Sequence, residues 1–151
     1  MENQTLNVNG TADRTVVSVR EFNATVHEVF DAWTNADKLA KWWGPKGFSN
    51  TFDEFNPTPG GNWRFTMHGP DGKNYPNESM YVEVGPEKIV LDHVNWPIFR
   101  LTATFEPVGS KTKLTFKQEF ESAEVFEKVK AVVVPSNEEN FDRLAVVLAE
   151  A

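Results

Sequence analysis

The sequence predicts an α+β domain in which a curved seven-stranded antiparallel sheet packs around a long C-terminal helix, with two short helices after the first strand. Two observations predict this class. A β-branched run is followed by two short helical patterns, then by six β-rich runs, and finally by a long helical pattern. Brief turn sequences separate the β-rich runs, and connections this short join antiparallel neighbours. Because side chains do not fill all the space between a strongly curved sheet and one helix, we expect a cavity there.

The first strand is predicted over residues 14–22, RTVVSVREF, because β-branched residues are frequent in it. TVHE at 25–28 is typical of a capping box, in which the Thr25 hydroxyl accepts from the Glu28 N–H while the Glu28 carboxylate accepts from the Thr25 N–H. Apolar residues then recur at i, i+3, i+4 and i+7, which predicts an amphipathic helix. The members of this stripe are Val26, Val29, Phe30 and Trp33.

A second short helix, ADKLAKWW at 36–43, is predicted between an Asn35 N-cap and the Gly-Pro pair that follows it. Trp42 and Trp43 are adjacent in sequence, so they cannot share a face of a helix or of a strand. We expect one indole, that of Trp42, to pack under this helix. We expect the other, that of Trp43, to lie at the mouth or wall of the cavity.

Six further strands are predicted from residue 48 onward, at residues 48–56, 62–68, 78–84, 88–95, 98–106 and 112–121. Their two-residue period is clearest in KLTFKQEF, where one face consists of Leu114, Phe116 and Phe120. In the strand at 88–95, two inward sets are compatible with the pattern. They are Val90 with Val94, and Leu91 with His93.

The last thirty residues return to helical spacing, with apolar residues at Phe126, Val129, Val133, Phe141, Leu144 and Leu148. Pro135 interrupts this pattern, and we expect it to end one short helix and start another, or to kink the helix. Asn137 falls in the same stripe and has two interpretations. In the first, which the pattern favours, Pro135 resets the helix and turns Asn137 to solvent as an N-cap. In the second, Asn137 points inward and is hydrogen-bonded.

The composition predicts one acidic domain. At 151 residues the chain is long enough for a substantial core, and we place the domain at residues 14–151, after a flexible polar tail at 1–13. The net charge of −7 and the pI near 5.0 argue against nucleic acid or membrane as partners, because both need a basic face. The absence of cysteine excludes disulfides and thiolate chemistry. No signal sequence or membrane-spanning run is visible, so we expect a cytoplasmic protein.

The sequence offers only isolated candidates for catalysis, and no catalytic residue is predicted. The histidines, His27, His68 and His93, match no short metal-ligand spacing, so no metal or other cofactor is expected. There is no nucleophile elbow, dinucleotide-binding motif or Walker A motif. His27 is expected at the surface. His93 lies in the mainly apolar run VLDHVNW and is either a hydrogen-bonding group of the cavity or a satisfied core or edge histidine.

The aromatic content is the remaining signal, with 12 Phe and 5 Trp. Most of these side chains are expected to form ordinary core. A subset is expected to line a ligand cavity, since such cavities have apolar walls and a few placed polar groups. The residues predicted to line it, with Trp43 at the entrance, are Trp43, Phe52, Phe65, Met67, Leu91, His93, Leu101, Phe116, Asn137 and Phe141.

Several of these segments together resemble a known family. They are FNATVHEVFDAWTNADKLAKWWGPKGF, PGGNWRFTM, YVEVGPEKIV and FDRLAVVL. The chain resembles the activator of heat-shock protein 90 ATPase homologue-like family, part of the START/SRPBCC (birch-pollen-allergen-like, helix-grip) superfamily, over about residues 14–150. The W-W-G-P corner followed by G-G-x-W-R is the most specific part. The resemblance implies the helix-grip fold, a curved antiparallel sheet around a C-terminal helix.

Two positions depart from the pattern of the family that the chain resembles. The family commonly has Gly-Trp where this chain has Ser136-Asn137, and often has a glycine where this chain has Ser79. A tryptophan would fill space beneath the helix. Asn137 therefore implies more room there and a polar group in its place.

One function is expected and two alternatives are kept beside it, because folds of this kind carry many activities. The first is non-enzymatic binding of a small apolar or aromatic ligand in the cavity. The second, implied by the resemblance, is a module that interacts with a chaperone. The third is a cyclase- or hydrolase-type enzyme that uses His93 or a buried carboxylate as a general acid or base.

Overall fold

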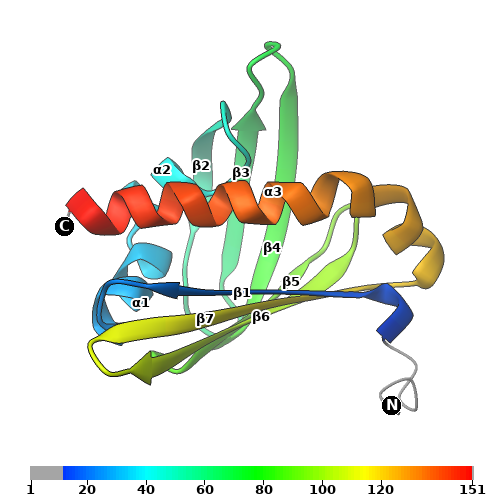
Figure 1. The fold of residues 1–151 in the computed structure, drawn as a ribbon. Helices are drawn as coiled ribbons and strands as arrows, with labels where there is room; N and C mark the ends of the chain where they lie inside the picture. The colour runs from blue at the N-terminus through cyan, green and yellow to red at the C-terminus, as the bar shows by residue number, and fades with distance from the viewer. Residues whose placement is uncertain (1–11, 151) are drawn as a thin grey trace.

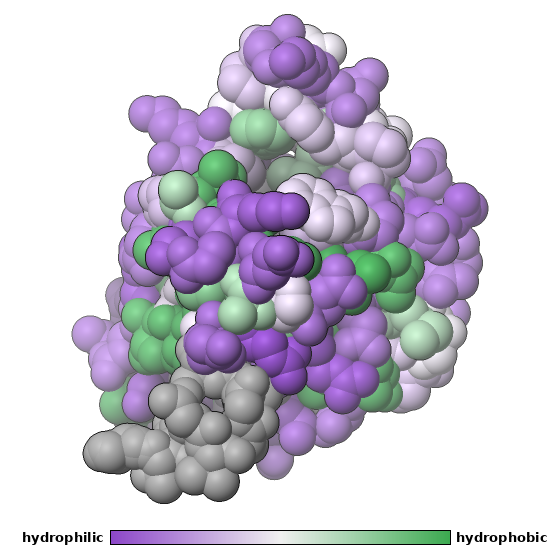
Figure 2. All heavy atoms as spheres, turned by 90° about the vertical axis from the view of Figure 1, so that its right-hand side faces the viewer, coloured by the Kyte–Doolittle hydropathy of each residue, from purple (hydrophilic) through white to green (hydrophobic). Residues whose placement is uncertain are grey.

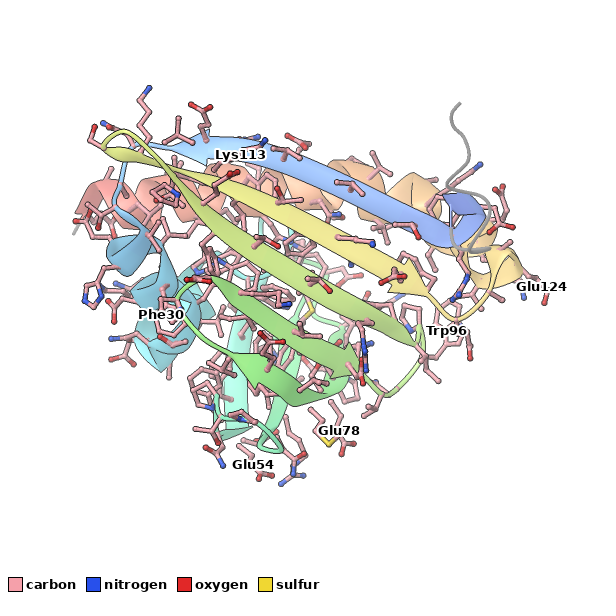
Figure 3. All side chains as sticks on the ribbon, turned by 90° about the horizontal axis from the view of Figure 1, so that it is seen from below. Phe30, Glu54, Glu78, Trp96, Lys113 and Glu124 are labelled. Atoms are coloured by element: carbon pink, nitrogen blue, oxygen red, sulfur yellow. The ribbon has the colours of Figure 1, made fainter. Side chains whose placement is uncertain are left out.

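The computed structural model describes residues 12–150 and confirms the predicted α+β architecture. Figure 1 shows the long helix α3 (Ala123–Glu150) lying across one face of a curved sheet, with the short helices α1 (Val26–Thr34) and α2 (Ala36–Trp42) together at one end. Figure 3 shows the molecule from below, where the strands lie in front of α3. The helices therefore cover one face of the sheet.

The sheet contains β1 (Thr15–Phe22), β2 (Ser49–Phe55), β3 (Asn62–His68), β4 (Asn74–Val84), β5 (Lys88–His93), β6 (Phe99–Val108) and β7 (Lys111–Phe120). The order across it is β1-β7-β6-β5-β4-β3-β2, and every neighbouring pair is antiparallel. From β2 to β7, each strand pairs with the next in sequence, as the short connections predict. The first strand, β1, pairs with β7 and completes the sheet.

Most strand ends lie within two residues of the prediction, and the largest difference is at the start of β4. The strand predicted at 78–84 begins earlier, at Asn74, which pairs with His68 across the β3–β4 hairpin. Its first residues are polar and include a proline, so the local sequence predicts a turn. They form a strand because they pair with β3. The predicted tail, residues 1–13, lies almost wholly outside the described residues, and Ala12–Arg14 form the short 3₁₀ helix η2.

The two short helices begin as the sequence predicts. The Thr25 hydroxyl accepts from the Glu28 N–H at 3.2 Å, and the Glu28 carboxylate accepts from the Thr25 N–H at 2.8 Å, which completes the capping box. Asn35 ends α1 and starts α2, and its side-chain oxygen accepts from two backbone N–H groups of the first turn of α2. One residue thus caps both helices and sets a sharp corner between them.

The prediction for Pro135 was wrong in that the helix does not end there. α3 runs without a break from Ala123 to Glu150, with Pro135 inside it and exposed to solvent. Figure 1 shows the first turns of α3 at an angle to the rest. Pro135 has no N–H to donate to the carbonyl of Ala131, four residues earlier, and an exposed position lets water take over that carbonyl.

The buried side chains form two clusters. The larger one joins α1, α2, the sheet and the C-terminal half of α3, where it includes Phe141, Leu144 and Val147. The smaller one joins Val16, Phe120 and Val129, with further apolar residues of the first turns of α3 packed against it. The two clusters hold α3 on the sheet at two separate places. Among residues 12–150, no helix is long and apolar enough to cross a membrane.

Candidate functional site

A cavity of about 680 Å³ lies between α3, the β3–β4 hairpin, the β5–β6 connection and the segment after α2. Figure 2 shows the side of the molecule that carries the β5–β6 connection, with less polar side chains set back beneath the projecting hairpin. The lining residues are Trp43, Gly44, Pro45, Phe48, Phe65, Met67, Asn74, Tyr75, Pro76, Asn77, Ser79, Leu91, His93, Asn95, Trp96, Pro97, Phe99, Phe116, Gln118, Val132, Val133, Ser136, Asn137 and Asn140. This volume lies within the range of small-molecule sites.

Most of the predicted site residues meet at this cavity. Seven of the ten line it, namely Trp43, Phe65, Met67, Leu91, His93, Phe116 and Asn137. In β5, the inward set is Leu91 with His93, whereas Val94 is 44% exposed. The alternation of that strand therefore follows the second of the two patterns that its sequence allows.

Three predicted residues lie outside the lining, although all three pack in the larger core cluster. Phe52 packs against Phe55 and Trp63 at the β2 edge of the sheet. Leu101 is fully buried in β6, and Phe141 is fully buried between Phe22 and Phe116. Their patterns correctly place them inward, but neighbouring side chains fill the space in front of them.

The two adjacent tryptophans have the roles that the sequence predicts. Trp42 is fully buried, and its indole N–H donates to the carbonyl of Ala32 at 2.8 Å. Trp43 forms a wall of the cavity, with its ring 5.1 Å from that of Trp63 and 6.3 Å from that of Phe116. The helix ends between them, since Trp43 has extended backbone angles, and this change of direction sends the indoles to different places.

Arg143 of α3 holds the segment after α2 in place. Its guanidinium donates to one backbone carbonyl in the last turn of α2 and to four of that segment. They are those of Lys41 (2.7 Å), Trp43 (3.3 Å), Gly44 (2.8 Å), Pro45 (3.0 Å) and Phe48 (3.0 Å). Burial lowers the pKa of Arg143 from its usual range, yet an arginine stays charged. A single side chain of the C-terminal helix thus fixes the corner that presents Trp43 to the cavity.

Gly44 suits this corner chiefly through its backbone conformation. Its φ of +98° lies in the left-handed region, which side chains disfavour. A Cβ atom there would also lie 2.8 Å from the terminal methyl carbon of Met67. The glycine therefore permits both the turn and the close approach of a lining residue.

Asn137 points inward, so the solvent-exposed N-cap interpretation was wrong. Its side chain is 3% exposed, and its amide N–H donates to the Gln118 side-chain oxygen at 2.8 Å. Because α3 continues through Pro135, position 137 keeps its place in the inward stripe of the helix. Both sequence departures noted above, Ser79 and the Ser136-Asn137 pair, lie in the cavity lining.

The sequence prediction missed several polar lining residues. Gln118 lies two residues after Phe116 on β7, so it points to the same inward face. A polar residue at such a position could have been recognised as lining the cavity. Asn140 lies one helical turn after Asn137 and was detectable in the same way. Trp96 comes from the β5–β6 connection and is 60% exposed; Figure 3 shows it at that connection. No periodicity predicts the direction of a loop side chain.

His93 is buried at the cavity wall and is held on both ring nitrogens. Nδ1 lies 2.7 Å from the carbonyl oxygen of Pro97, and Nε2 lies 2.7 Å from the side-chain oxygen of Asn77. The ring stacks on Phe99 with 4.8 Å between centroids. Burial lowers the pKa of His93 below its ordinary value of 6.5, and the contact with the Pro97 carbonyl opposes this shift. A neutral imidazole carries one N–H and can donate to only one of these two oxygens.

Lowering the pH is expected to destabilise the protein through His93. The unfolded chain takes up a proton near pH 6.5, whereas the folded protein resists protonation until a lower pH. The contribution of His93 to stability is thus complete above pH 6.5 and is lost as the pH falls through its folded-state pKa. Urea unfolding at pH 7.5 and pH 5.5 measures the loss, which should be smaller in His93→Gln. An equal loss in the two proteins would contradict the assignment.

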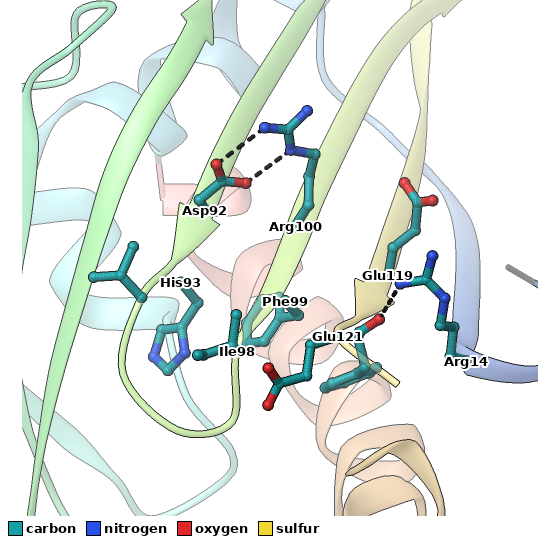
Figure 4. Close-up of a pocket in the computed structure, with 10 residues that line it drawn as sticks. Arg14, Asp92, His93, Ile98, Phe99, Arg100, Glu119 and Glu121 are labelled. Carbon is teal, nitrogen blue, oxygen red and sulfur yellow. Dashed lines mark hydrogen bonds and ion pairs between the residues drawn. The ribbon is translucent and has the colours of Figure 1, made fainter. Parts of the chain in front are cut away.

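A second hollow, of about 530 Å³, lies on the other side of His93 and Phe99 (Figure 4). Its walls include the Arg100–Asp92 pair, whose two hydrogen bonds measure 2.8 and 3.0 Å, and Arg14, which donates to a backbone carbonyl. Charged groups that already pair with one another line much of it. Within residues 12–150, no three His, Cys, Asp or Glu side chains are grouped so that they could hold a metal ion. The large cavity is accordingly the candidate site.

Comparisons with known proteins agree with this geometry. The family model described as "Activator of Hsp90 ATPase homolog 1-like protein" matches residues 23–149. No curated protein matches the chain. A solution structure of a protein from Arthrobacter aurescens is similar, with a TM-score of 0.85 and 26% identity over 92% of this chain and 88% of that one.

Two further solved structures share the fold. A protein from Nitrosomonas europaea has a TM-score of 0.84 and 19% identity, over 92% of this chain and 96% of that one. The AHSA1 protein from Silicibacter pomeroyi has a TM-score of 0.73 and 20% identity, over 90% and 98% of the two chains. The family model covers most of the chain and spans the corner, the cavity and α3. The chain therefore belongs to the Activator of Hsp90 ATPase homolog 1-like protein family.

Proposed function

We propose that this protein binds a small apolar or aromatic ligand in the large cavity, without transforming it. The observation that carries the proposal is the cavity of about 680 Å³, walled by aromatic and aliphatic side chains with a few amides and hydroxyls among them. A monomeric domain gains stability by filling such a space with its own side chains. A cavity of this size next to two well-packed core clusters is therefore best explained by an occupant.

The state of His93 supports binding rather than catalysis. A general acid or base must exchange a proton with its substrate within hydrogen-bond distance. Both ring nitrogens of His93 are instead within 2.7 Å of protein oxygens. No carboxylate is among the residues that line the cavity.

Fluorescence of the uncharged dye N-phenyl-1-naphthylamine tests the proposal, together with native mass spectrometry of protein purified from its own host. We expect the dye to bind the wild-type protein and not Asn137→Trp, whose indole would occupy the cavity beside Gln118. Val146→Trp is the matched control, because Val146 is on the same helix and is 59% exposed. Equal dye binding by all three proteins, with no co-purifying small molecule, would refute the proposal.

A chaperone partner is a second candidate, supported by the description of the family and by the net charge of −7, which suits a basic partner surface. Co-precipitation with purified Hsp90, followed by an ATPase assay, tests it. Binding at micromolar concentration with a change in ATPase rate would support the candidate. No binding at tens of micromolar would remove it.

A further inference from the structure

The lining of the cavity lacks charge. None of the 24 lining residues is Asp, Glu, Lys or Arg, although these four types make up 25% of the chain. Burial lowers the pKa of the imidazole in the lining, that of His93. An ion that entered the cavity would lose its hydration without gaining a counter-charge, which is strongly unfavourable. The lining therefore selects against carboxylates and ammonium groups.

Several polar side chains of the lining pair with one another, whereas one buried acceptor has no partner. The amides of Asn137 and Gln118 hydrogen-bond each other, and Asn77 contacts His93. Asn140 is 6% exposed, and its side-chain oxygen has no hydrogen-bond partner anywhere in residues 12–150. Of the four buried side-chain atoms in this unpaired state, it alone belongs to a residue of the cavity lining.

An unpaired buried acceptor is unfavourable, and a donor brought by a ligand removes the penalty. Asn140 lies one turn from Asn137 on α3 and lines the helix side of the cavity. Its side-chain oxygen has almost no accessible surface, so the amide has to rotate to meet a ligand. A hydroxyl group bound there would lose its water but would donate a hydrogen bond to the Asn140 side-chain oxygen. An ether oxygen, which only accepts, would leave the same acceptor unpaired.

We infer that the cavity takes an uncharged ligand with an aromatic or alicyclic body and a hydroxyl group, and that the hydroxyl donates to the side-chain oxygen of Asn140. This inference rests on the proposed function and specifies its ligand class. It makes Asn140 the residue that distinguishes an alcohol or phenol from its ether. The uncharged lining distinguishes the same ligand from the corresponding acid.

Three probes that share one skeleton test the inference: 2-naphthol, 2-methoxynaphthalene and 2-naphthoate. Their affinities are measured at pH 7.5 by displacement of N-phenyl-1-naphthylamine and by calorimetry. For the wild-type protein we expect 2-naphthol to bind about tenfold more tightly than 2-methoxynaphthalene, as one buried hydrogen bond predicts. We expect 2-naphthoate to bind more weakly than either.

Asn140→Leu, which keeps the size of the side chain, should bind 2-naphthol and 2-methoxynaphthalene equally. Val146→Trp should keep the wild-type preference. Equal affinity for the two uncharged probes in the wild-type protein would overturn the inference, and this comparison does not depend on any variant folding. Tightest binding of 2-naphthoate would overturn it as well. If no probe binds and the dye does not bind, the proposed function itself fails; if the probes bind without preference, only the ligand class fails.

Discussion

Replacing Trp42 by alanine is expected to lower the free energy of unfolding by about 3–5 kcal/mol, the usual range for removing a large aromatic side chain from a core. Trp42 is fully buried, contacts the ring of Trp33 at 5.0 Å between centroids, and donates to the Ala32 carbonyl. The substitution would leave a cavity between α1 and α2 and an unpaired carbonyl. Urea denaturation followed by circular dichroism measures the change.

The neighbouring substitution, Trp43→Ala, is the natural control. Trp43 is partly exposed to the ligand cavity, so its removal enlarges a space that already exists. We expect a smaller loss of stability and a clear loss of affinity for N-phenyl-1-naphthylamine. If the two variants lost stability equally and both bound the dye normally, the division of roles between the two indoles would be wrong.

Replacing Arg143 by methionine is expected to lower the free energy of unfolding by about 3 kcal/mol. Hydrogen bonds to charged groups contribute about 1.5–3 kcal/mol each, and water replaces part of the loss at this half-buried position. Five carbonyls, one in the last turn of α2 and four in the segment after it, would lose their common donor. Methionine keeps the apolar length of the stem, so the change isolates the guanidinium.

Arg143→Lys should be intermediate, because a compact ammonium cannot reach carbonyls spread around a planar fork. Dye affinity should fall in parallel with stability in both variants, since Gly44, Pro45 and Phe48 belong to the cavity lining. Thermal unfolding and the dye titration together check this. A fully stable Arg143→Met with a disordered corner, seen in NMR spectra of the Trp43 indole, would show that the contacts order the segment without stabilising the fold.

The predictable part of the fold is the part that periodicity controls. The capping box of Thr25, the double cap of Asn35 and the alternation of β7 are local patterns, and the structure contains each of them. Pro135 is different, because its effect depends on whether tertiary contacts on both sides hold the helix together. Those contacts come from clusters that only the folded chain assembles.

The sequence predicted which face of each element points inward, but not which of the inward residues reach the cavity. Phe141 and Leu101 were assigned to the correct face, and whether such a residue meets a cavity or another side chain depends on packing across the sheet. Gln118 and Asn140 show the reverse case. Each is a polar residue at an inward position of an otherwise apolar face. Such a residue indicates a cavity as strongly as an inward aromatic residue does.

The two core clusters hold α3 at two places, and α3 lines the cavity between them. Phe141, Leu144 and Val147 fix its C-terminal half, and Val129 fixes its first turns. The helix residues that line the cavity fall within 132–140, between these two anchors. Amide hydrogens of that middle stretch can therefore exchange through local opening at a lower free energy than global unfolding. Such opening would widen the cavity while both ends of the helix stay folded.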